Sequence, residues 1–244
     1  VTRIFKEAGF KTCSTSSVWF QIGDRKWKNK LKMGMPGRMF LQKFLRQARK
    51  EGSTHAVIEV SSEGILQNRH RFLNFHTAVI TNLSPEHIER HGSFEKYRAE
   101  KQKLFRTTQK VHIVNGDDEN AQYFLRIPAR KVYVYGLQNA PSLPDVTHYL
   151  AAENIAERRD GTNFQVNGKE FRLKLIGKFN AYNALAAICV GLAHGISMET
   201  CRDALAKMER MPGRTDPVVT EPFTVLVDYA VTPKALENLY SGVR

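Results

Sequence analysis

The sequence contains no apolar run long enough to cross a membrane. Its longest apolar stretches, residues 55–60 and 184–193, are far shorter than the ~20 residues that a membrane span needs. Residues 1–6 lack the charged, apolar and small-residue regions of a signal peptide, and they include no initiator Met. We therefore expect no membrane partner and interpret the sequence as a partial one.

Cysteine is also scarce. The 3 cysteines, Cys13, Cys189 and Cys201, are widely separated, form no CxxC pair and have no histidine at zinc-site spacing. An odd and scattered set of this kind excludes a disulfide framework and a zinc ribbon. The simplest setting for the protein is a reducing cytoplasm.

Acidic residues are outnumbered, since 37 Lys and Arg against 24 Asp and Glu give a net charge of +13. This excess predicts attraction to anions, but the basic residues are scattered along the chain, which is typical of a solvated surface. No recognised nucleic-acid motif occurs. We therefore expect no nucleic-acid partner. The alternative to an enzyme is a non-catalytic basic module that binds nucleic acid.

Short β-branched runs alternate with helical patterns, which predicts an α/β fold with a mainly parallel sheet and helices on both faces. Strands are expected at residues 56–60, 77–81, 111–114, 132–135 and 224–228. Helices are expected at residues 39–50, 180–194 and 197–208. Another helix ends near residue 105 and begins at either Ser84 or Ser93.

Turn residues complete this prediction. Asn167-Gly168 predicts a β-hairpin that joins residues 164–166 to residues 171–175. Residues 136–144 mix Gly, Asn, Ser and Pro, which predicts a loop.

Polar residues follow three of the predicted strands, where ligands of open parallel sheets bind. The motifs are Glu59-Val60-Ser61-Ser62, Thr81-Asn82 and Asn115-Gly116-Asp117-Asp118. Each alone is compatible with a cap or a turn, whereas the three together favour a site. Glu59 and His87 are candidate ligands of Mg²⁺, which takes few protein ligands, and the alternative is a capping carboxylate and a surface histidine.

Several motifs occur together in one order. They are Glu59-Val60-Ser61-Ser62 with Gln67 and Arg69, Thr81-Asn82-Leu83, Glu86-His87, His91-Gly92, Glu95, Tyr97, Lys101, Gly177 to Ala184, Pro212-Gly213-Arg214, and Val227 to Ala230 with Thr232-Pro233. In this order they resemble the central domain of the Mur ligases, with most similarity to the UDP-N-acetylmuramoyl-tripeptide synthetase branch. The resemblance spans most of the chain.

The resemblance implies a P-loop NTPase-like central domain over residues 1–213 and the start of a C-terminal α/β domain over residues 214–244. In the family a Gly-rich loop ending in Gly-Lys-Thr holds the ATP phosphates, and residues 1–244 contain no such loop. We expect that loop immediately before Val1, and we expect little activity from this fragment alone.

The resemblance also implies roles for individual residues. Glu59, His87 and Lys101 match metal-binding positions, His87 and Lys101 are implied catalytic residues, and Lys101 matches a lysine that the family carries as a carbamate. Substrate contacts are implied for Ser61, Gln67 and Arg69. Nucleotide contacts are implied for Asn180, Asn183, Arg214 and Asp228, and Asn180 is also compatible with a helix cap.

The activity implied is an ATP-dependent amide ligation through an acyl phosphate in peptidoglycan precursor synthesis. Its partners would be a UDP-N-acetylmuramoyl-peptide, ATP and an amino acid, with Mg²⁺ as cofactor, in a cytoplasmic monomer. A folylpolyglutamate synthetase-like ligase is a second enzyme hypothesis, disfavoured by the Ser61 to Arg69 run. The sequence departs from the family pattern at Val231, at Glu63 and at Gly34-Met35.

Overall fold

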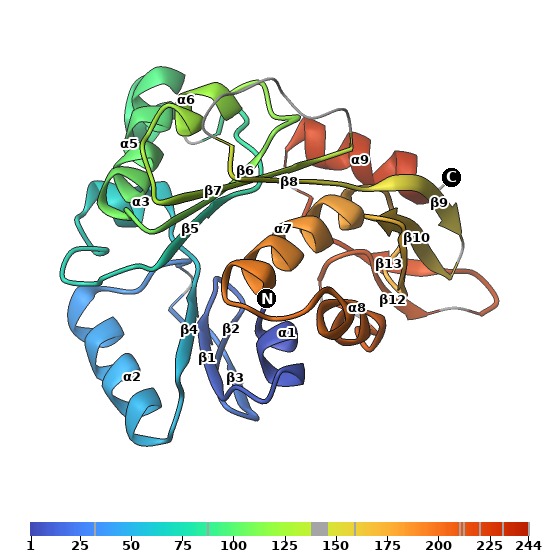
Figure 1. The fold of residues 1–244 in the computed structure, drawn as a ribbon, viewed down its shortest axis with the longest axis horizontal. Helices are drawn as coiled ribbons and strands as arrows, with labels where there is room; N and C mark the ends of the chain where they lie inside the picture. Colours follow the sequence, from blue (N-terminus) through green and yellow to red (C-terminus); the bar gives the residue numbers. More distant parts are fainter. Residues whose placement is uncertain are drawn as a thin grey trace.

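The computed structural model describes residues 1–31, 33–86, 88–137, 146–158, 160–209, 211, 213–219, 221–230 and 232–243. Figure 1 shows the arrangement of its elements. The helices are α1 (Thr2–Glu7), α2 (Arg38–Lys50), α3 (Ser62–Leu66), α4 (Ile88–His91), α5 (Phe94–Thr107), α6 (Ala121–Leu125), α7 (Phe179–Ala193), α8 (Met198–Ala206) and α9 (Pro233–Val243). The strands are β1 (Thr12–Thr15), β2 (Trp19–Ile22), β3 (Arg25–Lys28), β4 (His55–Ile58), β5 (Thr77–Ile80), β6 (Val111–Asn115), β7 (Lys131–Gly136), β8 (His148–Ala151), β9 (Glu153–Arg158), β10 (Gly161–Val166), β11 (Lys169–Leu173), β12 (Asp216–Val219) and β13 (Val225–Val227).

Strands β5 to β8 form a parallel sheet in the order β5-β6-β7-β8. Successive side chains of a strand point to opposite faces. Ile113 of β6 accordingly packs in the core around α7, whereas the neighbouring Val114 packs with Phe105 of α5 and Phe124 of α6. Helices therefore cover both faces of this sheet, as the sequence predicts (Figure 1).

A second sheet has the order β3-β2-β1-β4. β1 and β4 run parallel, but β2 and β3 join as an antiparallel meander that the sequence analysis did not predict. Helix α2 packs on this sheet through Phe44 and Ala48, which contact the cluster of Cys13, Phe20 and Ile22. β4 and β5 lie at the edges of their respective sheets.

Most of the strongly patterned elements are confirmed within a few residues of their predicted ends. The predicted hairpin is β10–β11, and Asn167 and Gly168 take the positive φ angles of 50° and 73° that its turn requires. Of the two predicted helix starts, Ser93 is right, because its hydroxyl accepts the backbone N–H of Lys96 at 3.3 Å. The start at Ser84 is wrong. Most of the predicted loop, residues 138–145, lies outside the described residues.

Helix α7 is apolar on nearly all sides and is buried along most of its length. It contacts β6, β7 and β8 on one side and α1, α8 and β10 on the others. A helix with this composition is stable only when every face is covered. The core therefore forms around α7.

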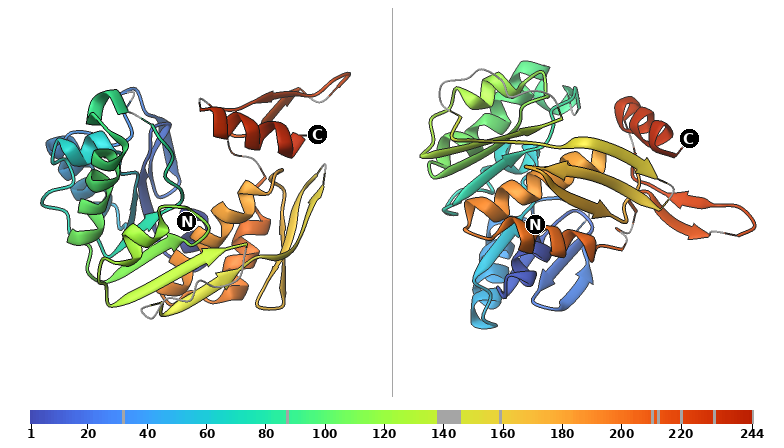
Figure 2. Two further views of the ribbon diagram at one scale, coloured as in Figure 1. Left: turned by 90° about the horizontal axis from the view of Figure 1, so that it is seen from above. Right: turned by 45° about the vertical axis from the view of Figure 1, so that its right-hand side comes forward.

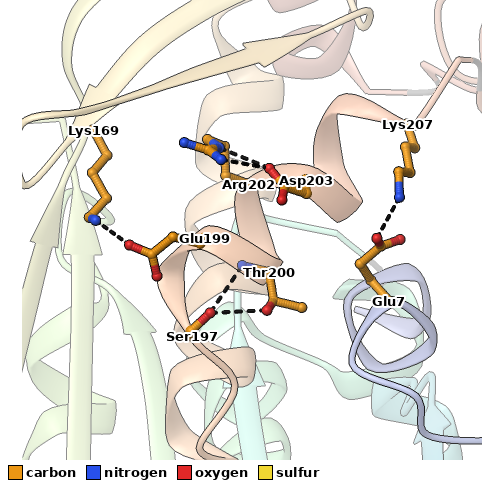
Figure 3. A network of polar contacts seen from close by, with 8 residues as sticks. All are labelled: Glu7, Lys169, Ser197, Glu199, Thr200, Arg202, Asp203 and Lys207. Carbon is orange, nitrogen blue, oxygen red and sulfur yellow. Dashed lines mark hydrogen bonds and ion pairs between the residues drawn. The ribbon is translucent and has the colours of Figure 1, made fainter.

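Polar contacts connect α8 to the elements beside it (Figure 3). The hydroxyl of Ser197 caps the helix by accepting the backbone N–H of Thr200 at 3.1 Å. Glu199 pairs with Lys169 of β11, and Lys207 pairs with Glu7 of α1. Exposed pairs of this kind contribute about 0–1 kcal/mol each, so apolar packing is the main force that holds α8.

Strands β12 and β13 and helix α9 form a small unit beside the main body (Figure 2). α9 comes close to the segment before α7, since a Cβ added to Gly242 would lie 3.2 Å from the Cα of Gly177. Among the described helices, none combines the length and apolar character of a membrane span.

Three histidines meet at the amino ends of the two sheets. His55 begins β4, His76 precedes β5, and His194 caps the C-terminus of α7. The ring of His194 lies 5.6 Å from that of His55 and 4.6 Å from that of His76, between ring centroids. Phe5 of α1 stacks on His55 at 4.5 Å, and His194 Nε2 lies 3.1 Å from the hydroxyl of Thr77.

The surroundings of this histidine cluster oppose protonation. Burial and then the positive charges of His76 and His55 lower the pKa of His194 from 6.5 to about 4. Burial also lowers the pKa of His55 and, together with Lys110 and Lys131, that of His76. Between pH 6.5 and 4 the unfolded chain therefore binds more protons than the folded chain does.

We predict that the free energy of unfolding falls as the pH is lowered from 6.5 to 4, because the histidine cluster must be protonated against its surroundings. His194→Leu should flatten this dependence in urea titrations at a series of pH values. His148→Leu is the matched control, since His148 lies exposed on β8 and stacks on Tyr133 instead. Equal slopes for wild type and His194→Leu would contradict the prediction.

Candidate functional site

Glu59 lies just past the carboxyl end of β4, with its side chain exposed. Its Oε2 atom accepts the backbone N–H of Ser17 at 2.7 Å, and its Oε1 atom accepts the Ser17 hydroxyl at 2.5 Å. Gly34 lies against the same carboxylate. Ser17 is absent from the sequence prediction because it belongs to the turn between β1 and β2, two strands that were not predicted.

Lys101 lies half-buried on α5. Burial lowers the pKa of its amine, and the carboxylates of Glu86 and Glu59 oppose this effect. The amine lies 5.3 Å from the centroid of the Tyr97 ring. Lys101 and Glu59 thus interact electrostatically. His87 lies outside the described residues, so the convergence of Glu59, His87 and Lys101 stays a prediction.

The three residues matched to substrate contacts gather around α3. Ser61 caps this helix, and its hydroxyl accepts the backbone N–H of Gly64 at 3.1 Å. Arg69 donates from Nη2 to the amide oxygen of Gln67 at 2.6 Å and from Nη1 to the carbonyl of Met35 at 2.6 Å. Arg69 also donates from Nε to the same Gln67 oxygen at 3.1 Å and from Nη1 to the Met33 sulfur at 3.2 Å. These bonds orient the guanidinium and leave one N–H on Nη2 for an anionic ligand.

Two of the family departures take part in this arrangement. The Glu63 carboxylate accepts a hydrogen bond from Nε2 of Gln67 at 3.1 Å, while Arg69 binds the oxygen of the same side-chain amide. Both the nitrogen and the oxygen of this amide are therefore fixed. Met35 supplies the carbonyl that Arg69 binds. The departures therefore belong to the same hydrogen-bonded group as the predicted substrate residues. Val231 lies outside the described residues.

The residues matched to nucleotide contacts form two pairs. Asn180 donates to the carbonyl of Ile176 at 2.8 Å, and Asn183 donates to Asn180 at 3.3 Å, at the start of α7. The helix-cap interpretation of Asn180 is wrong, because the capping position is Lys178 and no side chain caps it.

The second pair lies at the base of the β12–β13 unit. Arg214 donates to the carbonyl of Tyr229 at 3.0 Å, and its guanidinium lies over the Tyr229 ring. Asp228 accepts the backbone N–H of Thr215 at 2.6 Å. Both side chains therefore hold the segment that leads into this unit.

The polar residues at the end of β6 and just after it act mainly as loop anchors. Asn115 donates to the carbonyl of Thr81 at 2.8 Å, and Asp118 accepts the backbone N–H of Leu83 at 2.7 Å. Asp117 accepts the hydroxyl of Tyr182 at 2.8 Å. Burial and this bond raise the pKa of Tyr182. These contacts agree with the interpretation of residues 115–118 as a turn.

Glu59 is chemically suited to Mg²⁺, a cation that prefers oxygen ligands and keeps several waters. A carboxylate offers about four lone-pair positions, and Ser17 uses only two of them. An ammonium at Lys101 offers none. Within the part of the chain that the structure describes, no three acidic, histidine or cysteine residues converge on a possible metal position. Glu59 is thus the one proposed ligand whose side chain is described and carries a negative charge.

Comparison with known proteins identifies related chains. A family model described as the Mur ligase middle domain matches residues 1–191. The chain is 35% identical over 267 residues to the UDP-N-acetylmuramyl-tripeptide synthetase of Roseiflexus sp. (strain RS-1), covering 100% of this chain and 51% of that protein. It is 32% identical over 252 residues to the UDP-N-acetylmuramoyl-L-alanyl-D-glutamate--2,6-diaminopimelate ligase of Bacillus velezensis, covering 98% and 50%. The chain thus spans about half the length of these relatives.

Solved structures agree with this result. A UDP-N-acetylmuramoyl-L-alanyl-D-glutamate--2,6-diaminopimelate ligase superposes with a TM-score of 0.80 at 25% identity, covering 99% of this chain and 50% of that one. The MurF ligase of Thermotoga maritima in complex with ADP shares the fold, with a TM-score of 0.74 at 14% identity over 99% of this chain and 52% of that one. Because the family model covers residues 1–191 and the relatives match almost the whole chain, this chain belongs to the Mur ligase family.

Proposed function

We propose that this chain forms the central, ATP- and metal-handling part of an ATP-dependent ligase that adds an amino acid to a UDP-N-acetylmuramoyl-dipeptide during peptidoglycan precursor synthesis. The main structural support is the position of Lys101 on α5, which packs on α3 beside the substrate candidates and where the charges of Glu59 and Glu86 act on the amine. Residues 1–213 would be the central domain and residues 214–244 the beginning of a C-terminal domain. 2,6-Diaminopimelate, which several relatives carry in their names, is the first amino acid to test.

The proposed reaction has three steps. ATP phosphorylates a carboxylate of the muramoyl peptide, an amino group attacks the acyl phosphate, and an amide forms with release of ADP and phosphate. Arg69 and Gln67 would bind an anionic part of the muramoyl peptide and orient it. Mg²⁺ bound at Glu59 would neutralise charge on the transferred phosphoryl group.

The surroundings of Lys101 favour its proposed carbamate. Only a neutral amine attacks carbon dioxide, and burial shifts Lys101 toward that form by lowering its pKa. The product carries a negative oxygen in place of an ammonium that would repel a metal. Carbamylation therefore converts an obstacle into an anionic ligand.

We predict that Lys101→Ala lowers the turnover of the full-length ligase by about 10²–10³-fold, the scale of losing one electrostatic group in an active site. Short carboxylic acids should restore part of the activity by occupying the vacated position. Lys96→Ala is the control, since Lys96 lies on the same helix and is exposed. In ¹³C-bicarbonate, the wild-type chain should show a carbamate carbon signal that Lys101→Ala lacks. Full activity of Lys101→Ala would rule out the role.

We also predict that Arg69→Ala raises the Michaelis constant for the UDP-muramoyl peptide by about 10–100-fold, because a hydrogen bond to a charged group contributes about 1.5–3 kcal/mol. The Michaelis constant for ATP should change much less. Arg71→Ala is the matched control, because Arg71 lies two positions further on with its side chain exposed. Unchanged constants for the muramoyl peptide would show that Arg69 does not bind it.

A further inference from the structure

Two loop residues enclose the carboxylate of Glu59. Neither of them has a role in the mechanism proposed above. Ser17, from the turn between β1 and β2, donates to both carboxylate oxygens, at 2.7 Å from its backbone N–H and at 2.5 Å from its hydroxyl. Gly34, from the loop before α2, lies on the carboxylate as well. We call this enclosure the Glu59 niche.

The space at Gly34 exists only because that residue has no side chain. A Cβ there would lie 2.5 Å from Oε1 and 3.2 Å from Cδ of Glu59, which is closer than real contacts allow. The backbone does not explain the glycine, since Gly34 is not among the glycines with a positive φ angle. A Cβ at position 34 would therefore displace the carboxylate from its present position.

An exposed glutamate otherwise samples several rotamers, and a metal must select one of them at an entropic cost. Hydrogen bonds from neighbouring groups commonly fix a ligating carboxylate and improve the affinity for the metal. Ser17 occupies two of about four lone-pair positions, so the others stay available to an ion. A carboxylate fixed in advance in this way costs less to order when the ion binds.

We propose that Ser17 is a positioning residue that holds Glu59 ready for a divalent cation, and that Gly34 provides the space this orientation needs. The inference rests on the proposed function, because it takes Glu59 as the metal ligand. It adds two residues of this chain's own loops to the metal site, and neither of them contacts the reacting atoms.

The test is a titration of the chain with Mn²⁺ alone, with the free ion measured by electron paramagnetic resonance. Ser17→Ala and Gly34→Ala should each weaken the binding by about 10-fold, the lower end for loss of a supporting hydrogen bond. Ser17→Thr keeps the hydroxyl and should keep the wild-type affinity. Gly37→Ala is the matched control in the same loop, because a Cβ there meets nothing within 4 Å and the φ angle of −60° suits alanine.

The outcomes separate this inference from the function on which it rests. If Ser17→Ala binds Mn²⁺ as tightly as wild type or more tightly, Ser17 does not position Glu59 for the ion and the inference is overturned. If Glu59→Gln and wild type bind equally, Glu59 is not the ligand and the proposed metal role fails. A crystal structure of Gly34→Ala then tests the niche by itself. There the Glu59 carboxylate should be displaced, and an unmoved carboxylate would overturn the niche.

Discussion

The burial of α7 is the constraint on which the rest of the structure depends. This helix of 15 residues is apolar on nearly every side, so no orientation leaves one face suited to water. The parallel sheet covers one side, and α1, α8 and β10 cover the others. A helix of this length spans about 22 Å. It therefore reaches from Asn180 and Asn183 at its start to His194 in the histidine cluster at its end.

The ends of β6 and β4 show why polar groups in this fold have different roles. Near the start of α7, Tyr182 donates to Asp117, so the motif after β6 is tied to the helix and to neighbouring backbone groups. β6 is buried along its whole length, and polar groups at the end of such a strand need internal partners. β4 is an edge strand with partly exposed side chains. Glu59 after β4 can therefore stay exposed, and among the described residues its carboxylate accepts hydrogen bonds from a loop serine.

Elements with a strong local signal were predictable from the sequence. α2, α7 and α8 have helical periodicity, and Asn167-Gly168 identifies the β10–β11 turn without any distant partner. β1, β2 and β3 have 4 residues each, and their assignment depends on pairing with one another and with β4. β2 and β3 are joined by the two-residue turn Gly23-Asp24, a local hairpin signal that the sequence prediction missed, whereas the pairing of β1 with β4 is non-local and leaves little pattern in a short strand. The contacts of the site share this property, since Ser17 and Glu59 are 42 positions apart.

The electrostatics around Lys101 connect the proposed carbamate to the proposed metal. As an amine, Lys101 balances the carboxylates of Glu59 and Glu86, yet burial lowers its pKa and favours the neutral form. As a carbamate, it would place a third negative charge in the same part-buried region, and like charges there repel strongly. A divalent cation would remove that repulsion, so the carbamate would be more stable with the ion bound. By linkage the ion must also bind more tightly to the carbamylated chain, and carbon dioxide and Mg²⁺ would then increase each other's occupancy in the proposed site.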